Sequence, residues 1–554
     1  MKYKNLFFLT LLICQNLFSQ TQIGSDIDGE SSGDLFGYGV GMSSDGLTFA
    51  AGAREGNYVK VYNYNNNSWQ LVGSKINGPV GSENFGHSVA ISSDGTILAV
   101  GDRKFVRNNT GQTEDIVGAV YVYQYSDGSW SQLGSTLVGT QAGAYFGFDV
   151  SLSSDGSILA FGAPKYSLND NNSQGVAKIY QYSSGSWSQL GSDIDGDVIG
   201  ERLGYDVDLS SDGTIIAVGS PYYTSASSDN FGKVKIFQYS SGSWSQLGSD
   251  IIPTTTGNFG YKLGLSSNGN ILAVGDTNNR ARVYEYSDGS WTQLGSNIEG
   301  GNSTLHGVSA SDQYSRGISI SDNGLVLAVG GTQFHVGGEG KGAGKVGIYQ
   351  FESNSWSQKG NFINGESGGV DRDTQDPDTR DGDMAGEYIS LDSDGDVIMI
   401  GAPFNDGPGS VPSTDNYGHV RVFSTTIDIT APTMVITSSQ VSDGATSNDS
   451  TLSLTFTSSE ATTNFVVGDI TVGGGSLSSF ASTSSTVYTA TFTPSGDGAT
   501  TIDVAANTFT DSSGNNNTAA SQFNWTYDST APTMVITSSQ VSDGATSNDS
   551  TLSL

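Results

Sequence analysis

One hydrophobic pattern recurs seven times between residues 21 and 426. In the copy Ser92–Gly101, an Asp-Gly pair is followed by the apolar run Ile97–Val100 and then by a glycine. Every copy contains an Asp or Asn followed by Gly, from which we count, and the seventh residue after that starting Asp or Asn is always Gly: Gly52, Gly101, Gly162, Gly219, Gly275, Gly330 and Gly401. Successive copies start 49 to 71 residues apart, without helical periodicity. Such a period favours an all-β repeat protein built from small sheets.

Each copy predicts four antiparallel strands, which we describe for the second copy. The first strand is Val89–Ile91, and Asp94-Gly95 predicts a two-residue type I′ hairpin turn, whose central positions both need positive φ. The second, Ile97–Val100, is a continuous apolar run typical of a strand buried on both faces. The third is Ala119–Tyr123. The fourth is Ser129–Gly134, and its tryptophan recurs at Trp69, Trp187, Trp244, Trp291 and Trp356.

The last copy lacks a fourth strand. No fourth strand of this repeat follows Gly418–Phe423, but Gln22–Gly29 near the N-terminus matches Gln189–Gly196, the end of a fourth strand. We therefore expect the N-terminal segment to complete the seventh sheet and close the ring, so that no sheet keeps an unpaired edge. The sequence predicts a seven-bladed β-propeller over residues 21–426.

Short motifs flank the strands and point to a family. Phe-Gly pairs such as Phe85-Gly86, Phe146-Gly147 and Phe259-Gly260 precede the first strand, and Gly-Ala-Pro follows the second strand at Gly162 and Gly401. This pattern resembles the FG-GAP repeats of integrin-alpha-type propellers, which implies an extracellular role in adhesion or ligand binding. That family often carries a calcium loop between the first two strands. Here the loop is Ser-Ser-Asp-Gly, too short for a site of six to eight oxygens.

The candidate ligand site lies on the face with long loops. In a four-stranded antiparallel blade the short turns lie on one face and the variable connections on the other, where function usually resides. In each copy we expect the side chain at the seventh position before the Asp or Asn to face the mouth of the central channel. Together these side chains would form a ring: Tyr38, His87, Phe148, Tyr205, Tyr261, Arg316 and Glu387. This ring could hold a sugar or a peptide. Packing between blades is the alternative explanation.

An acidic connection, Asp371–Asp383, is the first candidate calcium site. Its carboxylates alternate around a glycine, as hard cations require, and the candidate ligands are Asp376, Asp378, Asp381 and Asp383. The spacing departs from that of an EF-hand, so a solvated acidic loop is the alternative.

Residues 427–530 predict a second domain of another kind. Thr451–Phe456, Val487–Phe492 and Gln522–Tyr527 alternate polar and apolar residues, as strands of a β-sandwich do. Asp511–Asn515 and Asp528–Pro532 resemble segments of the bacterial Ig-like repeats of surface adhesins. That resemblance implies calcium at the junction of the domain with the preceding one, with Asp428, Glu460 and Asp511 as ligands.

The end of the chain repeats part of this domain. Ala431–Leu454 recurs letter for letter as Ala531–Leu554. A piece this short cannot bury a core of its own, so we expect residues 531–554 to be unpartnered. We also expect the native chain to continue with further repeats.

The charge and the N-terminus indicate export. Lys plus Arg number 23 against 56 Asp plus Glu, a net charge of −33 that repels nucleic acid and anionic membranes. Lys2 and Lys4 before the apolar run Leu6–Ile13 predict a signal peptide over residues 1–20, too short to be a transmembrane helix. Cys14, the one cysteine, lies within it, so no disulfide is expected. A lipoprotein signal at Cys14 is the alternative.

No enzymatic motif stands out. The four histidines show no HExxH spacing, no G-x-S-x-G elbow occurs, and the glycine-rich run ending at Lys345 lacks the P-loop pattern. We expect a non-enzymatic secreted or cell-surface protein, with a monomeric propeller head on an Ig-like stalk that binds an extracellular glycan or protein. The alternatives are a carbohydrate-active hydrolase or lyase using carboxylates on the long-loop face, and a purely structural spacer.

Overall fold

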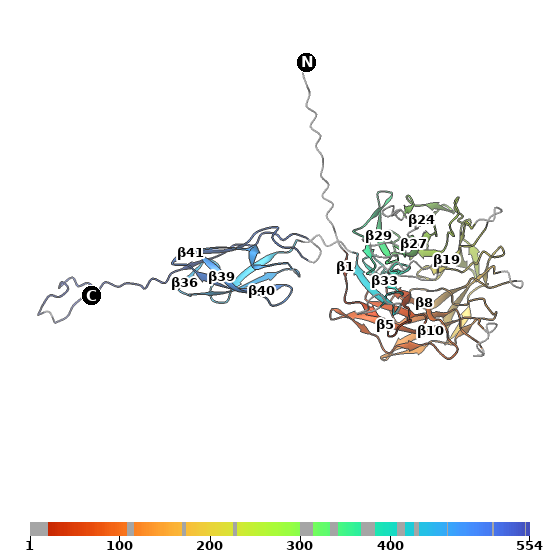
Figure 1. Ribbon diagram of the computed structural model, residues 1–554, viewed down its shortest axis with the longest axis horizontal. Coiled ribbons are helices and arrows are strands. Elements are labelled where there is room, and N and C mark those ends of the chain that lie inside the picture. Colours follow the sequence, from red (N-terminus) through yellow and green to blue (C-terminus); the bar gives the residue numbers. More distant parts are fainter. Residues whose placement is uncertain are drawn as a thin grey trace, which may run out of the picture. The chain divides into compact units, whose positions relative to one another are not determined.

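The computed structural model describes residues 20–107, 116–168, 173–224, 230–299, 314–332, 342–366, 383–406, 416–425, 431–462, 464–511, 515–548 and 550–553. Two compact units are present, Met1–Ile427 and Asp428–Leu554, and each is described by itself (Figure 1). Apart from one 3₁₀ turn, Val467–Asp469, the regular structure of the described residues is entirely β. The predicted signal peptide lies outside them, except for Gln20.

The described part of the first unit contains seven antiparallel sheets, numbered by the order in which the seven copies of the repeat occur, so that the sheet with β1 and β2 is the seventh. Sheets one to three consist of β3 (Phe36–Met42), β4 (Thr48–Ala53), β5 (Tyr58–Asn65), β6 (Ser68–Leu71) and β7 (Ile76–Asn77); β8 (Phe85–Ile91), β9 (Ile97–Asp102), β10 (Ala119–Ser126), β11 (Ser129–Gln132) and β12 (Leu137–Val138); and β13 (Val150–Leu152), β14 (Ile158–Ala163), β15 (Val176–Ser183), β16 (Ser186–Gln189) and β17 (Ile194–Asp195).

Sheets four to seven follow the same order. They consist of β18 (Val207–Leu209), β19 (Ile215–Ser220), β20 (Lys233–Ser240) and β21 (Ser243–Gln246); β22 (Lys262–Leu265), β23 (Ile271–Gly275), β24 (Arg280–Ser287), β25 (Ser290–Gln293) and β26 (Ile298–Glu299); β27 (Tyr314–Ile320), β28 (Val326–Gly331), β29 (Lys345–Glu352), β30 (Ser355–Gln358) and β31 (Ile363–Asn364); and β32 (Tyr388–Leu391), β33 (Val397–Ala402), β34 (His419–Ser424), β1 (Thr21–Gln22) and β2 (Ile27–Asp28). The four predicted strands of each copy are therefore present, and most sheets add a two-residue fifth strand beside the third.

The N-terminal segment completes the seventh sheet. Thr21 and Gln22 pair with Ser424 and Phe423, and the Ile23 amide donates a hydrogen bond of 2.8 Å to the Val422 carbonyl. Ile27 pairs further along the same strand. The predicted pairing of the two ends of this unit is confirmed.

The turn between the first and second strands differs from the prediction. Gly95 has a φ of +73°, whereas Asp94 is not in the left-handed region, so the type I′ turn predicted at Asp94-Gly95 is wrong. The Ser92 amide instead bonds to the Ile97 carbonyl, and the Ser92 hydroxyl donates to the Asp94 carboxylate at 2.7 Å while accepting from the Ile97 amide at 2.9 Å. These side-chain bonds support a longer loop, which removes the need for two positive φ angles.

Backbone hydrogen bonds join the sheets in cyclic order. The residue before each starting Asp or Asn donates its amide to the equivalent carbonyl of the next sheet, over 2.8 to 3.1 Å. The donors and acceptors run Ser44 to Ser93, Ser93 to Ser154, Ser154 to Ser211, Ser211 to Ser267, Ser267 to Asp322, Asp322 to Ser393, and Ser393 back to Ser44. Each sheet thus has two neighbours, and the seventh lies against the first.

The recurrent glycine at the end of the second strand is explained by this packing. A Cβ on Gly162 would overlap the main-chain carbonyl oxygen of Gly204, at the start of the next sheet, and the other recurrent glycines meet the next sheet in the same way. The second strand is also buried on both faces, as predicted: Ile158 and Ala160 pack toward sheet four, and Phe161 packs toward sheet two. Neighbouring sheets therefore approach too closely for any side chain at this position.

The second unit contains two four-stranded sheets around one core. One sheet has the order β35 (Met434–Ser438), β37 (Leu452–Ser458), β40 (Val487–Pro494) and β39 (Gly475–Ser482), and the other β36 (Ala445–Ser447), β42 (Phe523–Tyr527), β41 (Gly498–Val504) and β38 (Ile470–Gly473). Phe456, Phe492 and Trp525 are fully buried between them. The three predicted strands of this domain are present, and the described residues of 531–553 form no strand.

Candidate functional site

Six of the seven predicted ring residues form a continuous chain of contacts in the first unit. Ring centroids lie 5.1 Å apart between Tyr38 and His87, 5.1 Å between His87 and Phe148, 4.7 Å between Phe148 and Tyr205, and 5.0 Å between Tyr205 and Tyr261. The Arg316 guanidinium lies 5.4 Å from the centroid of the Tyr261 ring.

The chain of contacts also extends beyond Tyr38, its first member, to Tyr388. The centroid of the Tyr388 ring lies 4.4 Å from that of the Tyr38 ring, and the Arg54 guanidinium lies 4.1 Å from the centroid of the Tyr38 ring. Glu387, the seventh predicted residue, is buried and lines the same cavity. The sequence therefore placed these positions together correctly, and their role as a ligand site stays a prediction.

A cavity of about 240 Å³ lies at this ring and is lined by the first strand, or the residues just before it, of all seven sheets. Small-molecule sites usually enclose roughly 300–1,000 Å³. The cavity is thus large enough for one end of a ligand rather than for a whole drug-sized molecule.

His87 is a member of the ring whose polar atoms lack hydrogen-bond partners among the described residues. Its side chain is buried, and neither ring nitrogen has a hydrogen-bond partner within the described structure. Burial, with the nearby positive charges of Arg103 and Arg54, lowers the pKa of His87 well below its usual value of 6.5. The imidazole is therefore neutral at pH 7 and offers one donor and one acceptor.

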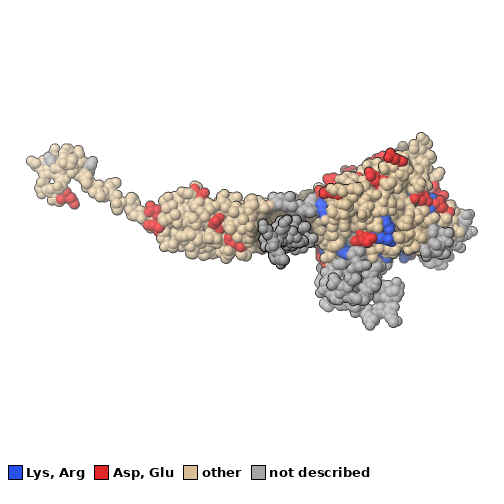
Figure 2. Space-filling model, turned by 90° about the horizontal axis from the view of Figure 1, so that it is seen from above, with Lys and Arg blue, Asp and Glu red and all other residues tan. Residues whose placement is uncertain are grey.

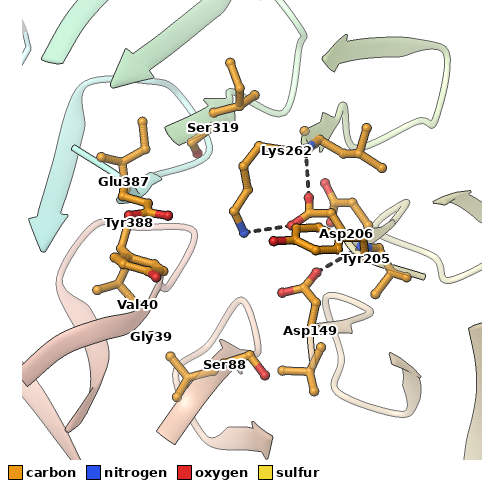
Figure 3. A pocket seen from close by; sticks show the side chains of 18 of the residues that line it. Gly39, Val40, Ser88, Asp149, Tyr205, Asp206, Lys262, Ser319, Glu387 and Tyr388 are labelled. Atoms are coloured by element: carbon orange, nitrogen blue, oxygen red, sulfur yellow. Dashed lines mark hydrogen bonds and ion pairs between the residues drawn. The ribbon is translucent and has the colours of Figure 1, made fainter. Parts of the chain in front are cut away.

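A charged cluster forms part of the cavity wall, as Figure 3 shows. The Lys262 ammonium lies 2.7 Å from Asp206 Oδ1, while the Leu263 amide donates to Asp206 Oδ2 at 2.7 Å. Asp149 accepts a hydrogen bond from the Val207 amide at 2.9 Å. Burial, together with the charge of Asp206, raises the pKa of Asp149 above its ordinary range, so this carboxyl holds a proton more tightly than a free one does.

Asp208, two residues after Asp206, lies in β18 and carries a third carboxyl group. It accepts hydrogen bonds from the Ser151 hydroxyl at 3.1 Å and the Leu265 amide at 2.7 Å, and burial raises its pKa to about 7. Each of these bonds reaches Asp208 from a neighbouring sheet.

Sequence reasoning missed this charged cluster, although a signal was available. Asp149, Asp206 and Lys262 each directly follow a predicted ring residue, so the repeat places them at one level. The hydrophobic pattern gave no reason to expect three charges at positions where the other sheets carry Gly, Ser or Tyr.

The predicted calcium sites are only partly within the described structure. Asp376, Asp378, Asp381 and Asp428 lie outside it. Asp383 is buried and accepts hydrogen bonds from the Glu366 amide at 2.7 Å and from Asn405 at 3.2 Å.

In the second unit, both carboxylate oxygens of Asp511 accept hydrogen bonds from Asn515. Among the described residues, the one group of three or more ligating side chains brought together is Asp26, Glu366 and His419, which no sequence pattern suggested.

The comparisons with known proteins concern the second unit. Residues 428–527 match the family of bacterial Ig-like domains. A comparison with curated proteins finds no match. Within the part of the chain that the structure describes, no helix combines the length and hydrophobicity needed to cross a bilayer.

Proposed function

We propose that residues 21–426 form a seven-bladed β-propeller of the FG-GAP type, and that this propeller is the ligand-binding head of an exported adhesion protein. The cyclic order of the seven sheets supports the architecture, and the matched bacterial Ig-like domain, of a kind typical of surface proteins, supports the location and the role of a stalk.

The observation that carries the proposed binding role is the ring of side chains around the cavity. Its aromatic faces offer stacking surfaces of the kind that bind the apolar faces of sugar rings, and His87 and the Arg316 Nε add polar atoms without partners inside the structure. Structural packing alone gives no reason to leave those polar atoms unpaired. A glycan end is therefore the ligand that we favour.

The surface charge narrows the class of glycan. Figure 2 shows Asp and Glu side chains scattered over the surface of each unit, in keeping with the net charge of −33. Such a surface repels polyanions such as sulfated glycans. The proposed ligand is a neutral or cationic sugar.

A glycan array with residues 21–530, with and without calcium, tests this role, and matrix proteins form a second panel. We expect Tyr205→Ala and His87→Ala to lower binding at least tenfold. Tyr182→Ala is the matched control, because Tyr182 contacts Trp187 at 5.2 Å but does not line the cavity. Binding that survives both ring substitutions would contradict a site at the ring, and an absence of any ligand would favour the structural spacer.

A second candidate function is favoured by the charged cluster. A glycoside hydrolase uses a carboxyl group with a raised pKa as its general acid, with a second carboxyl group as its partner, and burial raises the pKa of Asp149, Asp206 and Asp208. Release of reducing ends from any glycan bound on the array, lost in Asp208→Asn, would favour this hydrolase over the adhesin.

A further inference from the structure

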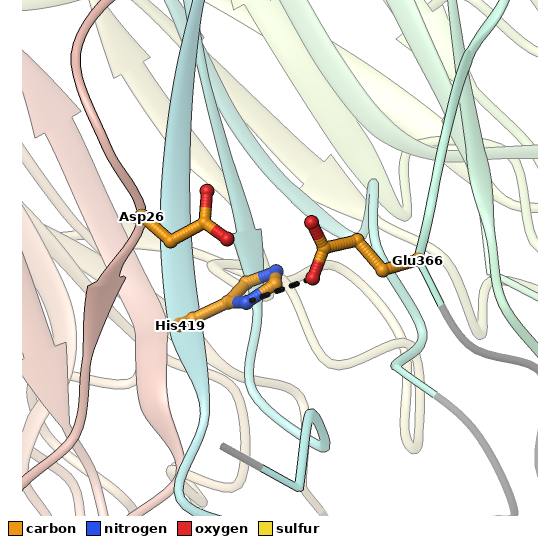
Figure 4. A group of neighbouring side chains, drawn as sticks. All are labelled: Asp26, Glu366 and His419. Carbon is orange, nitrogen blue, oxygen red and sulfur yellow. Dashed lines mark ion pairs between the residues drawn. The ribbon is translucent and has the colours of Figure 1, made fainter. Parts of the chain in front are cut away.

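Three side chains that could bind a metal meet where the chain closes the seventh sheet. Asp26 lies between β1 and β2, His419 begins β34, and Glu366 follows β31 of sheet six (Figure 4). One donor atom from each of the three lies within 4.8 Å of the others. The cluster therefore joins the N-terminal segment to two neighbouring sheets.

His419 is the buried member of the cluster. It is 1% exposed, its Nδ1 lies 3.9 Å from Glu366 Oε2, and its Nε2 has no hydrogen-bond partner within the described structure. Asp26 and Glu366 both reach solvent. A buried imidazole with an unused nitrogen beside two carboxylates leaves polar groups unsatisfied at a cost, unless a ligand binds them.

The protein contains a second copy of this arrangement in which a cation is present. The repeat aligns His419 with Lys233 of sheet four, Glu366 with Asp197, Asp26 with Asp250, and Asp383 with Glu201. The Lys233 ammonium lies 2.8, 2.9 and 3.8 Å from Asp197, Glu201 and Asp250. The same three carboxylate positions thus surround a positive charge in sheet four.

In sheet seven the same three positions surround an imidazole instead of an ammonium. His419 stands where sheet four has Lys233, whereas Arg421 has its own counterpart in Lys235. The cluster in sheet seven therefore has no ammonium at its centre.

We propose that Asp26, Glu366 and His419 bind one divalent transition metal of the zinc type, which takes the place of the missing ammonium and ties the N-terminal segment to sheets six and seven. One imidazole nitrogen and two carboxylates suit zinc, whereas calcium takes oxygen ligands alone. Water would complete the coordination.

The side chains can reach a coordinating geometry without moving the strands. Tetrahedral zinc, about 2.1 Å from each ligand, needs donor atoms roughly 3.4 Å apart, so the two solvent-reaching carboxylates must turn inward. Gln22 holds Asp26 Oδ1 at 2.6 Å and Arg421 lies 3.5 Å from Glu366 Oε1, which leaves the other oxygen of each carboxylate for the metal. Asp383 orients Glu366 by accepting a hydrogen bond from its amide.

Calorimetric titration of the chelator-treated full chain with zinc chloride tests the site. We expect one zinc per chain to bind with His419 present, to raise the melting temperature by about 3 °C at saturation, and to slow amide hydrogen exchange at Ile23 and Ile27. His419→Lys restores the arrangement of sheet four, so this variant should lose the zinc response and melt above the metal-free wild type.

Two surface substitutions keep the test decisive if His419→Lys fails to fold. Asp26→Asn should weaken zinc binding roughly tenfold or more. Asp250→Asn, the equivalent change beside Lys233, should leave it unchanged. Zinc binding of equal affinity in wild type and Asp26→Asn, or no binding by the wild type, would overturn the proposal, as would calcium producing the same heat and protection as zinc.

Discussion

Replacing Gly162 by alanine tests the packing between sheets at a single atom. The backbone of Gly162 is outside the left-handed region, so alanine suits its conformation. The added Cβ would overlap the carbonyl oxygen of Gly204, and the three atoms nearest to it all belong to the main chain of that residue. Because main-chain atoms cannot rotate away as a side chain does, sheets three and four must move apart.

The expected cost follows from the overlap and from what the separation disrupts. Overpacking a well-packed core costs about 1–3 kcal/mol, and a main-chain obstacle places this substitution at or above the upper end. Moving the sheets apart also loosens contacts of Ile158 and Ala160 with the core of sheet four. We expect Gly162→Ala to lower the free energy of unfolding by about 3 kcal/mol or more.

Gly185 provides a matched control within the same sheet. It has a φ of +85° but no atom within 4 Å of an added Cβ, so Gly185→Ala costs only the backbone strain of about 1 kcal/mol. Equilibrium unfolding in urea, followed by tryptophan fluorescence, measures both variants. A Gly162→Ala variant no less stable than Gly185→Ala would refute the close approach of the sheets and with it the explanation of the recurrent glycine.

Two further predictions concern closure and pH. Deleting residues 21–29 removes β1, β2 and the 2.8 Å bond from Ile23 to Val422, so the melting temperature should fall by several degrees; an unchanged value would contradict closure by the N-terminal segment. Because the folded state holds the Asp149 proton above the ordinary pKa of 3.8, wild-type stability should fall as pH rises from 3.8 through the raised pKa, and the loss should be smaller in Asp149→Asn, where the raised pKa of Asp208 remains. Melting temperatures at pH 5 and pH 8 measure it, and parallel changes in the two proteins would contradict the argument.

Much of the fold could be predicted because its determinants are local and repeated. Apolar runs such as Ile97–Val100 predicted buried second strands, and the match of Gln22–Gly29 with Gln189–Gly196 predicted the pairing of the chain ends. The ring from Tyr38 to Arg316 could be predicted because equivalent positions of a repeat lie at one level of the structure.

The features that could not be predicted depend on side-chain geometry or join distant segments. Asp94 avoids the left-handed conformation because the Ser92 hydroxyl supports a longer loop, which depends on side-chain geometry. The charged cluster combines Asp149, Asp206 and Lys262 from three sheets. Their pKa values depend on burial that no linear spacing expresses.

The duplicated segment separates what sequence determines from what tertiary structure decides. Residues 431–454 and 531–554 have the same sequence and therefore the same strand propensity and alternation. Met434 lies in β35 and is 3% exposed, because β37 pairs with that strand and the sandwich core covers its apolar face, whereas Met534 lies outside any strand and is 86% exposed. The amino-acid pattern determined which side chains would face a core. Among the described residues, only the first copy has pairing strands and an opposing sheet, which give it backbone partners and an apolar surface to pack against.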